Sequence, residues 1–118
     1  MARADRLEAM DIRRAALEVE YREALIDALR ATAAGSWGLF DHQQDRRTRA
    51  TIAPVVDNLI ELADAIDSHR DKLGLPPFAL HEEFLASRGR VSSSAVGEPK
   101  QARAWLDRLE AAAPADSA

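Results

Sequence analysis

The chain has 118 residues, of which 47% are apolar and 31% charged, and a formal net charge of −4. This balance fits one small globular domain and excludes a highly charged, disordered chain. Acidic and basic residues are interspersed, so the basic patch that a nucleic-acid-binding protein needs is missing. The absence of cysteine excludes disulfides and thiolate chemistry.

The first predicted element is a long helix over residues 3–34, a segment without proline or glycine that is rich in strong helix formers. Gly35 follows as its expected C-cap. Successive residues are about 100° apart around a helix, which divides the apolar side chains into two groups. One side carries Leu7, Met10, Leu17, Tyr21, Leu25 and Leu29, and Ile12, Val19 and Ile26 lie nearly opposite.

Ile12, Val19 and Ile26 are spaced seven residues apart, the repeat that keeps one face of a helix against a neighbour. Two explanations are open: the C-terminal helices cover these residues within the monomer, or a second copy or another protein does. Exposing all three would forgo about 1.5 to 3 kcal/mol for each side chain. We therefore predict that they form a partner-binding surface, most simply in a homodimer.

The connection GSWGLFDHQQDRR, residues 35–47, places Trp37, Leu39 and Phe40 beside polar residues. In one interpretation these three side chains fold back and plug the open end of a helical hairpin, where they bury a large area. In the other they remain exposed and form a second docking surface for a partner protein.

The second helix is expected to begin at Asp41 or Asp45 and to end before Gly74. Pro54 interrupts its pattern, so we expect either a kink there or a helix start near Thr51. The apolar side of this helix consists of Ile52, Val55, Val56, Leu59, Ile60, Leu62, Ala63, Ile66 and Leu73.

Two shorter helices are predicted after it. The first is PFALHEEFLASR, which starts at Pro77 and is closed by Gly89, and the serine-rich residues 90–98 then form a loop. Pro99 opens the last helix, whose apolar positions follow the helical repeat: Ala102, Trp105, Leu106, Leu109 and Ala113. We predict an all-α fold, a long antiparallel hairpin with two shorter helices in a four-helix bundle-like domain over 1–113, and a frayed tail over 114–118.

The sequence offers no convincing catalytic or metal site. His42, His69 and His81 all lack an acidic residue three positions earlier, so the Glu-x-x-His pattern of di-iron bundles is missing. No Gly-rich phosphate loop and no Gly-x-Ser-x-Gly elbow occur either. We expect His69 at the edge of the core, and we expect no catalytic residue, metal or cofactor.

One acidic pattern gives an alternative. Glu20-x-x-Glu23 and Glu61-x-x-Asp64 resemble the paired acidic motifs of the all-α nucleoside triphosphate pyrophosphohydrolases of the MazG type. The resemblance implies that four carboxylates on two adjacent helices hold Mg²⁺, which prefers hard oxygen ligands, against a triphosphate. The chain departs from that pattern in the long gap between the motifs and in Glu61 and Asp64, which lie opposite the apolar face.

The function expected from the sequence is a self-associating protein-interaction or structural module without catalysis. Its expected partner is a second copy or another protein. We do not expect it to bind nucleic acid or a membrane. No apolar run approaches the roughly 20 residues that cross a bilayer. The first residues, MARADRLEAMDIRR, contain acids and lack the apolar core of a signal peptide. We therefore expect a cytoplasmic protein, and its alanine- and arginine-rich composition is compatible with a GC-rich bacterial genome.

Overall fold

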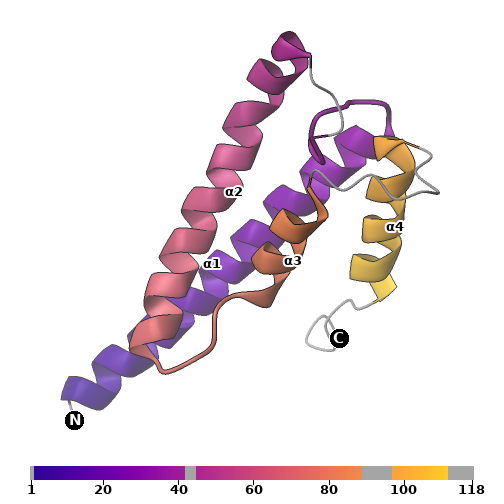
Figure 1. Cartoon of the computed structure of the whole chain (residues 1–118). Coiled ribbons are helices and arrows are strands. Elements are labelled where there is room, and N and C mark those ends of the chain that lie inside the picture. The colour runs from indigo at the N-terminus through magenta and orange to yellow at the C-terminus, as the bar shows by residue number, and fades with distance from the viewer. Residues whose placement is uncertain (1, 42–44, 89–96, 112–118) are drawn as a thin grey trace.

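The computed structural model describes residues 2–41, 45–88 and 97–111, and all regular structure within these ranges is helical (Figure 1). In chain order the helices are α1 (Ala2–Ala33), α2 (Arg46–Lys72), α3 (Ala79–Ser87) and α4 (Glu98–Ala111). The predicted all-α class, with a long hairpin followed by two shorter helices, is confirmed. Gly89, Ala113 and the predicted tail lie outside the described residues.

Helices α1 and α2 form the antiparallel hairpin, and α4 packs on another side of α1 (Figure 1). The short helix α3 contacts α2. The buried residues of the hairpin follow the helical repeat, with Leu17, Tyr21, Leu25 and Leu29 on α1 and Val56, Leu59, Ala63 and Ile66 on α2. Across the part of the chain that the structure describes, no helix combines the length and apolar character needed to cross a membrane.

The first turns of α1 are less buried than the sequence pattern predicts. Leu7 is 39% exposed and Met10 is half-buried, although both lie on the predicted core face. Figure 1 shows the reason, since the N-terminal end of α1 extends past the end of α2. Side chains there have the right angular position but no neighbouring helix to cover them.

Local capping sets the ends of the hairpin. Gly35 has a φ of 121°, and the backbone N–H of Ser36 donates to the carbonyl of Ala31 at 3.0 Å, so α1 ends where predicted. The carboxylate of Asp45 accepts from the backbone N–H of Thr48 at 3.0 Å and caps α2. Helix α2 therefore starts directly after Asp45, and Pro54 lies inside it, so the alternative start near Thr51 is wrong.

A buried carboxylate fixes the loop after α1. Glu98, the first residue of α4, is fully buried and accepts from the backbone N–H groups of Gly38 at 2.9 Å and Phe40 at 2.6 Å. Leu39 and Phe40 are also fully buried within the core. The loop thus closes the end of the hairpin, and the carboxylate lies at the N-terminus of α4, where the helix dipole favours negative charge.

We predict that Glu98→Gln lowers the free energy of unfolding by about 1.5 to 3 kcal/mol, the usual value of a hydrogen bond to a charged group. A glutamine amide places N–H groups where one carboxylate oxygen now accepts. The measurement is urea denaturation followed by circular dichroism. Glu110→Gln, the same change at an exposed residue of α4, is the control and should alter stability by less than about 0.5 kcal/mol. Equal stabilities for the two variants would contradict this account of the loop.

Candidate functional site

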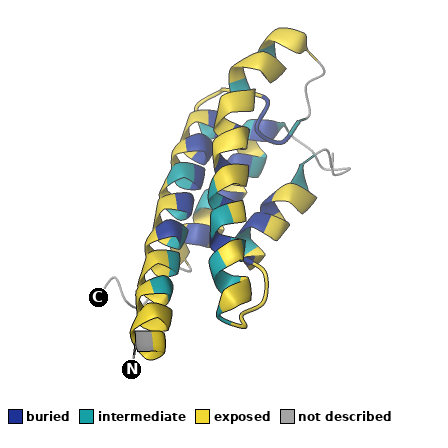
Figure 2. Ribbon diagram, turned by 90° about the vertical axis from the view of Figure 1, so that its left-hand side faces the viewer, coloured by how far each residue is buried: buried dark blue, intermediate teal, exposed yellow. Residues whose placement is uncertain are grey.

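The outer face of α1 carries the most exposed large apolar side chains of the described chain. Ile12 is 64% exposed and Val19 is 57% exposed. Figure 2 shows the exposed residues that run along α1 beside its buried ones. Ile26 differs from the other two, because it is half-buried and packs against the core. The three residues predicted as one surface therefore divide into an exposed pair and a covered third residue.

The length of α4 explains this division. Helix α1 has 32 residues, about 48 Å, whereas α4 has 14 residues, about 21 Å. The end of α4 is fixed to α1 where the Arg22 guanidinium donates to the Leu109 carbonyl at 2.7 Å. Ile26 lies within the stretch that α4 covers, and Val19 and Ile12 lie beyond its end. Cover within the monomer therefore applies to Ile26 alone.

Two alanines extend the exposed apolar surface. Ala9 and Ala16 precede Ile12 and Val19 by three residues, so they lie next to them on the same side of the helix. Both alanines are exposed. We call the set of Ala9, Ile12, Ala16 and Val19 the outer strip. The pattern of large apolar side chains does not include these alanines, although their three-residue offset from Ile12 and Val19 is readable from the sequence.

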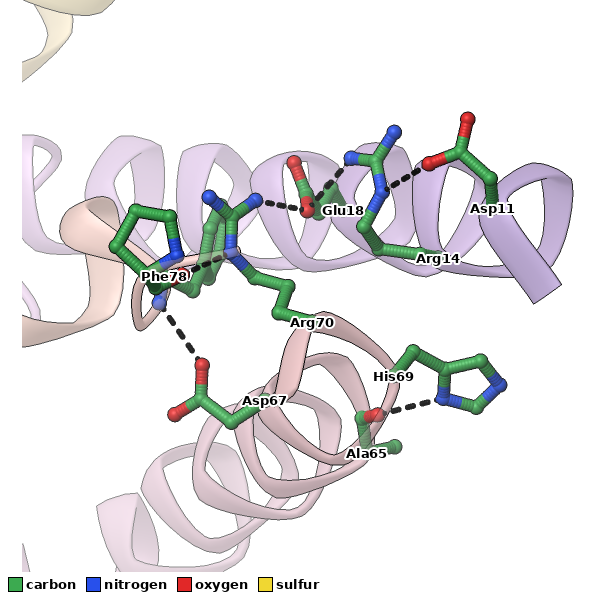
Figure 3. A network of polar contacts seen from close by, with 9 residues as sticks. Asp11, Arg14, Glu18, Ala65, Asp67, His69, Arg70 and Phe78 are labelled. Carbon is green, nitrogen blue, oxygen red and sulfur yellow. Dashed lines mark hydrogen bonds and ion pairs between the residues drawn. The ribbon is translucent and has the colours of Figure 1, made fainter. Parts of the chain in front are cut away.

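A polar network occupies another side of the same part of α1 (Figure 3). Arg14 pairs with Asp11 at 2.9 Å and with Glu18 at 2.8 Å, and Arg70 pairs with Glu18 at 2.7 Å. The Arg70 guanidinium also donates to the carbonyl of Pro76. These contacts attach the C-terminal end of α2 to α1. The charges of this network are satisfied within the chain, whereas Ile12 and Val19 of the outer strip stay exposed.

Figure 3 also shows how the segment after α2 is positioned. The Asp67 carboxylate accepts from the backbone N–H of Phe78, the N-cap residue of α3, at 2.8 Å. It thereby satisfies one of the free N–H groups at the start of this helix, whose N-cap side chain makes no capping bond. His69 is half-buried, as expected, and its Nδ1 donates to the carbonyl of Ala65 at 2.8 Å. Both side chains thus make structural contacts. His42 lies outside the described residues.

The loop residues considered as a second docking surface are mostly in the core. Leu39 and Phe40 are fully buried, and only Trp37 keeps an exposed fraction, 37%. The Trp37 ring lies against Gly97, where an added Cβ would be 2.9 Å from a ring carbon. A partner cannot reach Leu39 or Phe40 without opening the domain, so we leave them out of the proposed surface.

Tyr21 and His81 form a buried polar contact that no sequence pattern predicts. The Tyr21 hydroxyl and His81 Nδ1 share a hydrogen bond of 2.7 Å, and both residues are buried. Burial raises the pKa of Tyr21 far above its ordinary value. Burial also lowers the pKa of His81, partly opposed by the charges of Asp67, Asp64 and Glu82. The two side chains satisfy each other inside the core, which is a structural role.

The four carboxylates of the enzyme alternative do not converge. Glu20, Glu23, Glu61 and Asp64 are all exposed. Within residues 2–41, 45–88 and 97–111, no group of three or more His, Cys, Asp or Glu side chains is placed to hold a metal ion. The arrangement that the resemblance implies, four carboxylates around one Mg²⁺, is therefore not present in the described chain.

A shallow groove lies between α1 and α2. Its apolar lining includes Ala28, Ala31, Pro54 and Val55, and its polar lining is Asp27 and Asn58. A single carboxylate beside one amide provides neither a nucleophile with a base nor a ligand set for a metal. The groove therefore provides no candidate for catalysis or metal binding.

We predict that the free energy of unfolding falls as the pH drops below about 6.5, the ordinary pKa of histidine. Folded His81 binds its proton more weakly than the unfolded chain does, so protons favour unfolding. The contribution of His81 is complete above that pH and is lost as the pH falls toward the lowered pKa, with a slope of at most about 1.4 kcal/mol per pH unit.

Urea denaturation at several pH values between about 5.5 and 7.5 measures this slope. His81→Asn should reduce it, whereas His69→Asn, which leaves His81 in place, should retain it. The same pH dependence in the His81→Asn variant would show that another group is responsible.

Comparison with protein families gives no match for this chain, and neither a curated protein nor a solved structure is significantly similar to it. Its function must therefore be inferred from its own surfaces, among which the outer strip of α1 is the clearest candidate for binding.

Proposed function

We propose that this protein is a small helical module that self-associates through the outer strip of α1 and acts by protein–protein contact, without catalysis. The observation that carries the proposal is the exposure of Ile12 and Val19, at 64% and 57%, on a face of α1 that neither α2 nor α4 covers. Side chains of this type contribute about 1.5 to 3 kcal/mol each when they are fully buried. A helix that lies on the strip would recover much of that free energy.

A second copy is the simplest partner because it presents the same apolar strip. Two-fold dimers are the commonest oligomers of soluble proteins, and their interface uses one patch on both subunits. The strip is narrow, so the contact belongs to the small class of interfaces, and we expect association that weakens on dilution. The proposal includes a cytoplasmic location, in keeping with the acidic, cysteine-free sequence.

The test is the solution mass measured by light scattering over a roughly hundredfold dilution series. The chain has a mass of 13.0 kDa, and we expect twice this value at the highest concentrations. The Ile12→Ser/Val19→Ser variant should remain a monomer while keeping its helical circular dichroism, because both positions are exposed. Ile26 is left unchanged, since it packs against the core.

Leu85→Ser is the matched control, because Leu85 is also exposed, at 43%, but lies on α3. This variant should form dimers like the unchanged chain. A monomer at every concentration would overturn self-association. A dimer that persists in the Ile12→Ser/Val19→Ser variant would assign self-association to another surface.

A further inference from the structure

Four charged residues border the outer strip at the same seven-residue spacing. Arg6, Arg13, Glu20 and Asp27 follow one another along α1 in a row that drifts by only about 20° per step. All four are exposed. None of them makes an ion pair or a side-chain hydrogen bond with another residue of the described chain, in contrast to Arg14 and Glu18 nearby. We call them the charge row.

The charge row changes sign at its middle. Its two N-terminal members are basic and its two C-terminal members are acidic. A second α1 aligned in parallel would place the two charge rows on opposite edges of the contact, where they could not pair with each other. A second α1 that runs antiparallel would place Arg6 near Asp27 of the other copy and Arg13 near its Glu20. The order of charges thus favours one orientation of a self-pairing helix.

The apolar residues are compatible with the same orientation. Ile12 and Val19 lie on either side of Ala16, close to the midpoint of the charge row. Antiparallel pairing about this point brings Ile12 of one copy toward Val19 of the other. Ala9 and Ala16 are small, which allows two helix axes to approach closely at the contact.

The rest of the domain leaves room for this contact. Helix α2 and helix α4 pack on two other sides of α1, and the network of Arg14, Glu18 and Arg70 belongs to the junction with α2. The outer strip faces away from both helices, as the exposure of Ile12 and Val19 shows. A second copy of α1 would become a further neighbour of this helix, in addition to α2, α4 and the Tyr21–His81 contact with α3.

We infer that two copies of this chain pair antiparallel through the outer strips of their α1 helices, with each copy's Arg6 and Arg13 facing Asp27 and Glu20 of the other. This inference rests on the proposed self-association and adds its partner surface, orientation and register.

Disulfide cross-linking tests the orientation directly, because the unchanged chain has no cysteine. Three samples are oxidised and separated on a non-reducing gel. They are the Ala16→Cys variant, the Ala9→Cys variant, and a mixture of Ala9→Cys with Glu23→Cys chains. Ala16→Cys should cross-link to itself, because residue 16 lies near the two-fold axis. Ala9→Cys should not, because its two copies would be about 21 Å apart along the helices. The mixture should give the cross-linked heterodimer.

Charge reversal tests the register independently. Arg13→Glu should weaken dimerisation roughly tenfold, because it places two carboxylates together at both symmetric positions. Arg13→Glu/Glu20→Arg should restore the dimer, because the exchanged charges again face each other. Arg103→Glu, an exposed position on α4, is the control and should leave the dissociation constant unchanged.

The outcomes separate the two proposals. A chain that remains a monomer overturns both of them. A dimer in which Ala9→Cys cross-links efficiently to itself, or in which the charge exchange fails to restore pairing, retains self-association and overturns the antiparallel arrangement.

Discussion

Helix α1 packs against α2 on one of its sides and against α4 on another, and its Tyr21 also contacts His81 of α3. Helix α4 is much shorter than α1, with 14 residues against 32. Since α4 ends beside Arg22, the N-terminal half of α1 keeps apolar side chains that the described chain does not bury. The exposure of the outer strip is thus a consequence of the difference in helix length. Because the strip lies on a helix, its side chains lose little conformational entropy on association.

The irregular segments depend on carboxylates that are distant in the sequence. Buried backbone N–H groups need acceptors, and loops cannot supply them through regular helical bonds. Glu98 provides them for Gly38 and Phe40, and Asp67 provides one for Phe78. In the described part of the chain, every buried side-chain nitrogen or oxygen atom has a hydrogen-bond partner. The hairpin loop is therefore part of the folded core, which explains why Leu39 and Phe40 are unavailable to a partner.

The charged side chains of α1 fall into two groups, those that form ion pairs within the chain and those that do not. Around Arg14 and Arg70 the charges are paired within the chain and join α2 to α1. The charge row beside the outer strip has the same residue types but no partner among the described residues. In the proposed antiparallel pair, the loop ends of the two domains would point in opposite directions. Such a dimer would present the Trp37 region twice, at its two ends.

The sequence by itself determined the helices and the angular position of their apolar faces, because helical periodicity and the stops at Gly35 and Gly74 depend on residues close together in the chain. It also placed Ile12, Val19 and Ile26 on one face. Only the tertiary structure decided which of these three is covered, because that depends on where α4 ends. The Glu98 contacts and the Tyr21–His81 hydrogen bond each join residues about 60 positions apart, and no local pattern encodes such a pairing.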